Sequence, residues 1–165
     1  MAVTLEGIID TAITLVKQAA FFEDNNIPVE PIYLPDQVYD IPDNECVGVG
    51  LPSGSSLYDP EIGQYSSGGG GPIPTAFEAE MILVVKSVGE DGVTTLHERL
   101  FPVSTAALAA IFGQDLNPDT ADTACSIWAY PPVKYEVVPF PGYRGDKGPA
   151  LIIWTFRVQV INLEL

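Results

Sequence analysis

The single histidine limits the chemistry that side chains of this sequence could perform. Nucleophilic triads and most zinc sites draw on histidine, and His97 is followed by Glu98 and Arg99 in a strand-like or helix-like pattern. We expect a solvated histidine here. The two cysteines, Cys46 and Cys125, form no CxxC pair. This spacing favours small buried hydrophobic side chains over a zinc site or a disulfide.

Two groups of carboxylates could do acid–base work or bind calcium without histidine. Acid–base catalysis needs a desolvated carboxyl group with a shifted pKa. Both groups lie among Pro, Asn and Thr, where carboxylates cap turns and face water, and neither has the spacing of an EF-hand loop. We therefore expect no enzyme, no bound metal and no cofactor. The groups are Asp40, Asp43 and Glu45, and Asp115, Asp119 and Asp122.

Two short motifs carry little functional information. Gly48, Gly50 and Gly54 lack the spacing of a dinucleotide-binding loop. Pro52 would also block the helix that should receive the phosphate. Arg144–Asp146 is the Arg-Gly-Asp tripeptide that some adhesion receptors bind, and we interpret it as ordinary turn chemistry.

Composition predicts an acidic globular domain. The 165 residues are 47% hydrophobic, with 22 Asp and Glu against 7 Lys and Arg and a formal net charge of −15. This balance argues against binding to nucleic acid phosphates or to an anionic membrane. It suits either a protein kept soluble by its charge or a channel wall past which DNA slides. No apolar stretch approaches the ~20 residues of a membrane span, and residues 1–6 lack the features of a secretory signal, so we expect a cytoplasmic origin.

The first half of the chain predicts one helix and two short strands. Thr4 is the expected cap of a helix over residues 5–21. Extended segments are expected at 29–34 and at Cys46–Leu51, where glycines indicate the close approach of another backbone. Residues 52–76 are expected to form a long flexible loop. The helix has a buried face of Leu5, Ile8, Ile9, Ala12, Val16 and Ala19.

The second half predicts strands at 77–88, 133–139 and 151–163. In the first strand, Glu78, Glu80 and Lys86 should face water. Residues 93–103 fit either a strand or a helix, and the safer prediction is a helix from Ser104 through Phe112. Two sets of side chains should face the core: Phe77, Ala79, Met81, Leu83 and Val85, and Ile152, Trp154, Phe156, Val158 and Val160.

These elements predict an α+β fold in one domain spanning residues 1–165. A mixed or antiparallel sheet is flanked by the N-terminal helix and the mid-chain helix. Long connections rich in Pro and Gly, at 15 residues each, join the elements.

This order of elements resembles the tail terminator (tail-completion) proteins of long-tailed bacteriophages, of the lambda type. The resemblance covers most of the chain and is one of topology. It implies a virion protein that forms a hexameric ring on the end of the tail tube. Such a ring stops tube polymerisation and meets the head connector. The residues that carry the resemblance are Leu5–Ala20, Asp43–Leu51, Phe77–Val88, Thr94–Phe112 and Ile152–Leu163.

A ring needs an interface between copies that closes on itself. The edge of the strand at 77–88 or of the closing strand could supply it by strand pairing, and the loop at 52–76 could order on contact. Expected partners are further copies and other tail or neck proteins, with DNA passing through the ring and no membrane contact. Tyrosines suit an interface or the rim of a small core. The expected interface residues are Tyr58, Tyr65, Phe77, Met81, Arg144 and Trp154.

Two other functions remain open. A tail-tube subunit or capsid cement protein built as a β-sandwich is favoured if residues 93–103 form a strand. A carboxylate-based ligand-binding or hydrolytic domain would instead use the acidic groups of the Pro-rich loops.

Overall fold

The computed structural model describes residues 4–56, 76–87, 96–118, 128–131, 134–139 and 150–161. Its helical elements are α1 (Leu5–Gln18), α2 (Ala20–Asn25), the 3-10 helix η1 (Pro35–Asp40), the π-helical turn η2 (Leu96–Leu100) and α5 (Phe101–Ile111). Its strands are β1 (Val29–Pro31), β2 (Glu45–Ser56), β3 (Ala76–Ser87), β4 (Trp128–Ala129), β5 (Lys134–Pro139) and β6 (Ala150–Ile161).

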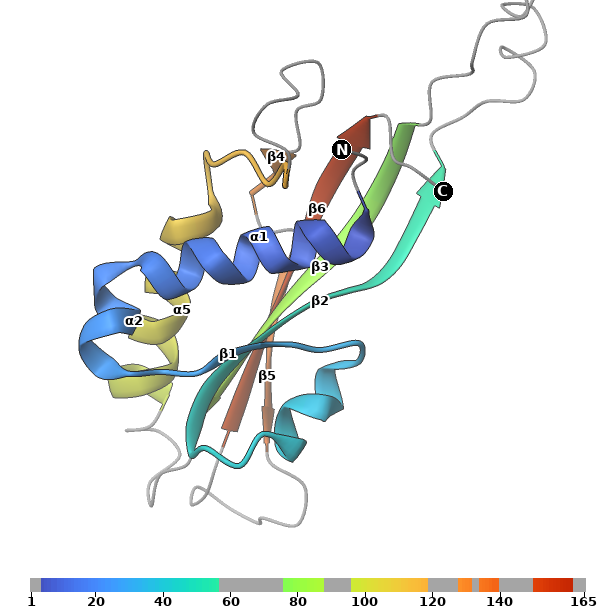
Figure 1. Ribbon diagram of the computed structural model, residues 1–165. Coiled ribbons are helices and arrows are strands. Elements are labelled where there is room, and N and C mark those ends of the chain that lie inside the picture. Colours follow the sequence, from blue (N-terminus) through green and yellow to red (C-terminus); the bar gives the residue numbers. More distant parts are fainter. Residues whose placement is uncertain are drawn as a thin grey trace, which may run out of the picture.

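These strands form one mixed sheet, as predicted. The order is β1-β2-β3-β6-β4, and β5 also pairs with β6. Only β1 and β2 are parallel among the paired strands, and the other pairs are antiparallel. The helix α1 crosses one face of the sheet, with α2 and α5 beside it (Figure 1). The α+β prediction is confirmed.

The N-terminal helix begins as predicted and ends earlier. Thr4 caps α1, since its Oγ1 accepts a hydrogen bond from the N–H of Gly7 at 3.0 Å. The helix stops at Gln18 instead of residue 21, because Ala19 has an extended backbone. The Ala19 carbonyl accepts from the N–H of Phe22 at 2.9 Å and so begins α2. This second helix brings Phe22 into the core.

The glycines of β2 lie where another backbone approaches, as predicted. A methyl group at Gly50 would lie 2.1 Å from the carbonyl oxygen of Ile32. At Gly48 it would lie 2.8 Å from the Cδ1 atom of Ile32. The chain leaving β1 can therefore cross β2 closely, and the N–H of Ile32 donates to the carbonyl of Val49 at 2.9 Å.

The strand β2 is longer than predicted. It continues to Ser56 after a register shift between Gly50 and Ser53, so residues 52–56 are strand and not loop. Pro52 lies inside this irregularity, one of the few places where a sheet tolerates proline. The remainder of the predicted loop, 57–75, lies outside the described residues.

The main core lies between the sheet and the helices. The alternation predicted for β3 and β6 is confirmed, because Met81, Leu83, Phe156 and Val158 are all buried against the helices. From the helices, this core takes Ile8, Ala12, Ile13, Val16, Leu100, Val103, Ala107 and Ile111.

The opposite face of the sheet is also covered over part of its area. Val38 of η1 packs on Cys46, Ile82 and Val84 in a second apolar cluster. The prediction that Lys86 faces water is wrong, since its side chain is buried and its Nζ donates to the carbonyl of Ile41. The short helix η1 covers this end of the face, and alternation along β3 alone could not indicate that.

The ambiguous segment before α5 is helical over its described part. Residues 96–100 form η2, and α5 follows without a break, so Ser104 is buried inside the helix and is not its cap. Pro102 lies in the first turn of α5, directly after the π-helical turn η2, so the change of helix type falls beside the residue that lacks an N–H group. Gly113 has a φ of +72° just beyond the helix, a conformation that glycine adopts readily where a helix ends.

An ion pair joins this helical segment to the sheet. Arg99 binds Glu45 at the start of β2 through both carboxylate oxygens, with Nε–Oε2 at 2.8 Å. The hydrogen bond to Glu45 raises the pKa of Arg99 above its usual range. The two-residue strand β4 pairs with Gln159 and Val158 of β6. None of the helices in the described ranges is both long and apolar enough to cross a bilayer.

We predict that Gly50→Ala destabilises the protein by about 1–3 kcal/mol, the usual range for overpacking a filled space. The new methyl group would meet the backbone carbonyl of Ile32, which cannot rotate away as a side chain could. Urea unfolding measures the change. Ser53→Ala, at an exposed position of the same strand, is the control and should be nearly neutral. Equal effects of the two substitutions would contradict this account of the β1–β2 contact.

We predict that Cys46 makes folding less favourable at high pH. Burial raises the pKa of its thiol from 9.0 to about 11. Between these values the folded protein keeps a proton that the unfolded chain releases, so the unfolding free energy falls as pH rises from 9 to 11. Urea unfolding across this range should show a shallower decline for Cys46→Ala. An unchanged decline would show that Cys46 does not contribute.

Candidate functional site at the open edge of the sheet

The structure does not bring the predicted interface residues together. Tyr58, Tyr65 and Arg144 lie outside the described residues. Phe77 lies in β3, between Ser56 of β2 and Val160 of β6. Met81 is fully buried in the core, so its side chain is not available to a second protein. Trp154 is partly buried and stacks on Tyr135, with ring centroids 4.9 Å apart.

The two strand edges that we predicted for assembly are occupied. The strand β3 pairs with β2 on one side and with β6 on the other along nearly its whole length. The second edge of β6 pairs with β5 over 150–155 and with β4 at 158–159. The prediction that either strand offers a free edge is therefore wrong, because alternation shows which face of a strand is buried and not which neighbours it has.

An open edge lies instead on β2. The strand β1 covers β2 only from Val47 to Val49, and Ile32 makes the last hydrogen bond between them. Beyond this point, none of the strands in the described part of the chain lies beside β2 on this edge (Figure 1). The chain turns away because the Gln37 Oε1 accepts from the N–H groups of Tyr33 and Leu34, at 2.6 and 3.2 Å.

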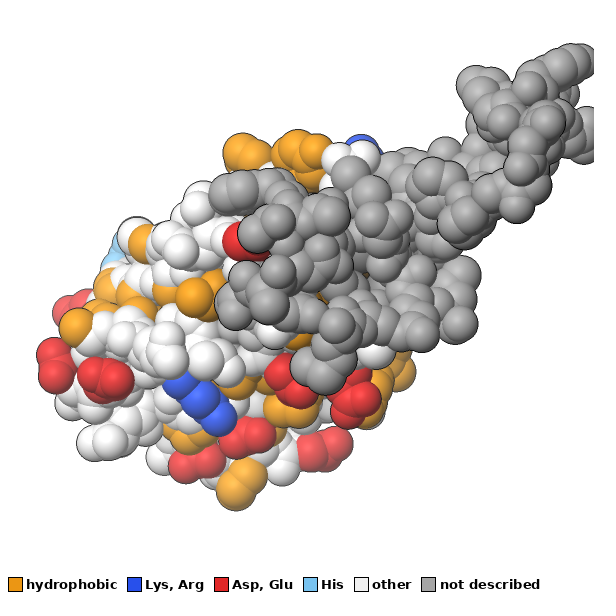
Figure 2. All heavy atoms as spheres, turned by 45° about the horizontal axis from the view of Figure 1, so that its top comes forward, with side chains coloured by type: hydrophobic (Ala, Val, Ile, Leu, Met, Phe, Trp, Pro, Cys, Tyr) orange, Lys and Arg blue, Asp and Glu red, His pale blue; other side chains and the backbone are white. Residues whose placement is uncertain are grey.

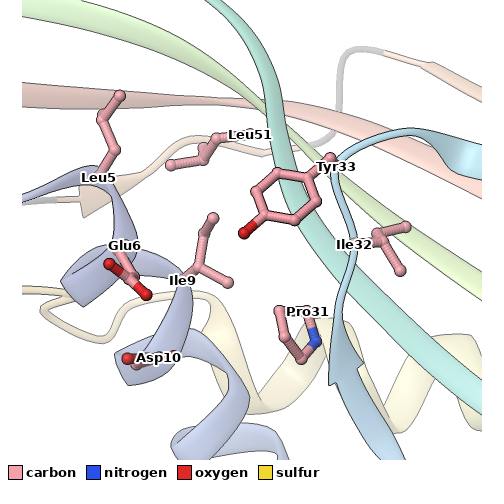
Figure 3. Close-up of a pocket in the computed structure, with 8 residues that line it drawn as sticks. All are labelled: Leu5, Glu6, Ile9, Asp10, Pro31, Ile32, Tyr33 and Leu51. Atoms are coloured by element: carbon pink, nitrogen blue, oxygen red, sulfur yellow. The ribbon is translucent and has the colours of Figure 1, made fainter. Parts of the chain in front are cut away.

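An apolar pocket of about 380 Å³ lies next to this edge on the helix side. Figure 3 shows Leu5 and Ile9 of α1 facing Leu51 of β2, with the Tyr33 ring on the far side of the space. Two carboxylates, Glu6 and Asp10, line the α1 side of the pocket. The pocket thus has apolar walls and an acidic rim, and Tyr33 itself is 75% exposed.

A polar hollow of about 290 Å³ lies beside the same stretch of β2. Its lining is Ser53, Gly54, Glu78, Glu80 and Arg157. The three charged residues lie on the sheet face away from α1, since their neighbours Ala79, Met81 and Val158 face the core side. Arg157 pairs with Glu78 at 3.5 Å, while Glu80 is exposed. The open segment of β2 therefore has a pocket on each face.

The other end of the sheet presents β5. This strand pairs only with β6 among the described strands, so its second edge has no described neighbour. Tyr135 and Val137 pair with Trp154 and Ile152, which places them on the helix side of the sheet. They are nevertheless 55% and 40% exposed. Two apolar side chains thus stand uncovered on an outer strand.

The residues considered first for chemistry do not form a described site. His97 is exposed, as predicted, and makes a T-shaped contact with Phe101, with ring centroids 5.6 Å apart. Glu45 is engaged by Arg99, and Asp115 accepts from the N–H of Asn117 at 3.0 Å. Asp119 and Asp122 lie outside the described residues. Within the ranges that are described, no three potential metal ligands cluster.

Sequence reasoning missed the β2 edge and the carboxylates beside it. A signal was present, because Pro52 and the small residues after Leu51 are typical of an edge strand. Glu6 lies in the first turn of α1, where an acidic side chain stabilises the helix start, so its presence alone does not indicate a pocket.

We predict that Gln37→Ala loosens the turn that leads the chain away from β2. The N–H groups of Tyr33 and Leu34 lose their shared acceptor, so both amides should exchange with deuterium faster. Stability should fall by about 1 kcal/mol, as for loss of ordinary hydrogen bonds. Gln114→Ala, at an exposed position after α5, is the control. Unchanged exchange at Tyr33 and Leu34 would show that Gln37 does not hold the turn.

Comparisons with known proteins assign no family to this geometry. A scan against protein-family models gave no match, and a search of curated proteins found no relative of this chain. The resemblance to tail terminators thus stays a prediction from the order of the elements.

Proposed function

We propose that this chain is a structural virion assembly protein of the tail-terminator type. It forms a ring of identical subunits on the end of a phage tail tube and joins the tube to the head connector. Its partners are further copies and other tail or neck proteins, and its role is assembly without catalysis. It does not bind DNA directly or contact a membrane.

The observation that carries this proposal is the pair of unlike edges on one sheet. A ring of identical subunits uses a heterologous interface, in which one surface of each copy meets a different surface of the next. The open segment of β2 and the outer strand β5 lie at opposite ends of the sheet and differ in side chains. Unpaired strand edges readily pair with another chain.

The acidic surface is compatible with the same role. The net charge is −15, and in Figure 2 acidic side chains are spread over the visible face and are not gathered in one patch. A negative surface facing the lumen would let DNA pass without binding it.

The alternative of a tail-tube or cement protein built as a β-sandwich is weaker. A strand at residues 93–103 would favour this alternative, but the described part of the segment is helical. In the described residues one sheet has α-helices on one face and the 3-10 helix η1 on part of the other, whereas a sandwich needs two packed sheets.

We expect the purified protein to form a closed ring, with six chains of 17.7 kDa as the resemblance implies. Light scattering and native mass spectrometry measure the assembly, and electron microscopy with tail tubes tests whether the ring binds the tube end. The ring should dissociate into single chains and not into stable dimers. A protein that stays a single chain at millimolar concentration would overturn this function.

A further inference from the structure

We propose that the open edge of β2 is the docking site for the β5 strand of a second copy of this chain. This inference rests on the proposed function, because it identifies the interface that would close the ring. Strand addition of this kind takes affinity from backbone hydrogen bonds and specificity from pockets for alternate side chains. The two pockets that flank β2 and the two faces of β5 fit together in this way.

The helix side of the contact is apolar. In a ring, rotation from one copy to the next keeps the helix side of each sheet facing the same way. Tyr135 and Val137 would therefore meet the pocket of Leu5, Ile9 and Leu51. A tyrosine suits this pocket, since its ring covers apolar walls while its hydroxyl can donate to a carboxylate of the rim.

The opposite side of the contact is charged. Neighbouring residues of a strand point to opposite faces, so Lys134 projects on the face away from the helices, where it is exposed. On that face it meets the hollow of Ser53, Gly54 and Glu80. Because Ser53 and Gly54 of β2 are small, the Lys134 side chain can extend over them toward Glu80 of β3. Glu80 lies two strand spacings, each of about 4.8 Å, from the docked strand. A lysine and a glutamate together span that distance.

This geometry explains why β5 is suited to be the inserted strand. Both of its exposed apolar side chains lie on one face, and the other face carries the exposed side chains of Lys134 and Glu136, in a chain with only 7 Lys and Arg. Pairing the β2 edges of two copies would instead bring together their two pocket rims, each with Glu6 and Asp10. Because like charges that face each other across an interface weaken association, the complementary pairing is head to tail.

Two substitutions should disable the two halves of the contact separately. Ser53→Lys places a positive charge in the hollow and repels Lys134, while β5 stays intact. Tyr135→Asp removes the aromatic side chain and faces the acidic rim, while the β2 edge stays intact. Each variant alone should associate at least about tenfold more weakly than the natural chain, since each interface carries a like-charge contact. Val137→Asp replaces Tyr135→Asp if the latter fails to fold, as judged by thermal unfolding.

Mixing the two variants gives the decisive measurement. One natural β5 and one natural β2 edge remain, so native mass spectrometry should show a one-to-one dimer of the two variants and no ring. In a single chain, Ser53→Lys combined with Lys134→Glu should restore the ring, because the charges are again opposite. Thr105→Lys, at an exposed site on α5, and Tyr130→Asp, at an exposed tyrosine outside β5, are matched controls and should leave the assembly unchanged.

The outcomes separate this interface from the function on which it rests. Rings that resist both substitutions would overturn the β2–β5 contact and leave the proposed function in place. Association of either variant with itself into a stable dimer would also overturn it, because that requires a symmetric interface. A natural chain that never associates would overturn both.

Discussion

The contact between Ile32 and the two glycines of β2 determines much of this architecture. Because Gly48 and Gly50 carry no side chain, the segment leaving β1 can cross β2 at a distance that no Cβ atom would permit. The crossing places Ile32 on the sheet face away from α1, where it joins the second apolar cluster with Val38. The same crossing ends the pairing of β1 with β2. The absence of side chains at Gly48 and Gly50 therefore both completes the second apolar cluster and leaves the far part of the β2 edge without β1 as a neighbour.

The two faces of the sheet are covered by different means, and this leaves the ends of the sheet unlike each other. Helices α1 and α5 cover the middle of one face, and η1 covers part of the other. Coverage stops before β5, where Tyr135 and Val137 remain exposed, and before the far part of β2. The two outer edges of the sheet therefore differ, and a head-to-tail assembly needs two different surfaces on each subunit.

Charge sets the conditions under which such an assembly forms. With a net charge of −15, copies of this chain repel one another at long range, and added salt screens that repulsion. Attractive charge contacts between copies must then come from the few basic groups. Arg99 and Arg157 are engaged within the chain by Glu45 and Glu78, and Lys86 is buried under η1. Lys17 of α1 and Lys134 are exposed in the described part of the chain, and of these two only Lys134 lies on an outer strand.

The sequence alone determined the features that depend on neighbouring residues. The Thr4 cap, the alternation in β3 and β6, and the role of the β2 glycines all follow from short-range geometry, and the structure confirms them. Helix ends were less well predicted. A proline within a helical pattern usually indicates a break, yet Pro102 in the first turn of α5 is compatible with helix.

Only the tertiary structure decided which strands are neighbours and what covers each face. The burial of Lys86 depends on η1 and on Ile41, which lies 45 positions away in sequence, and the occupied edges of β3 depend on β2 and β6. The pocket at the β2 edge likewise joins α1 with the end of β1 and with Leu51. Alternation indicates that a strand has a buried face, but strand order and layer coverage arise from contacts between distant segments, which no local pattern encodes.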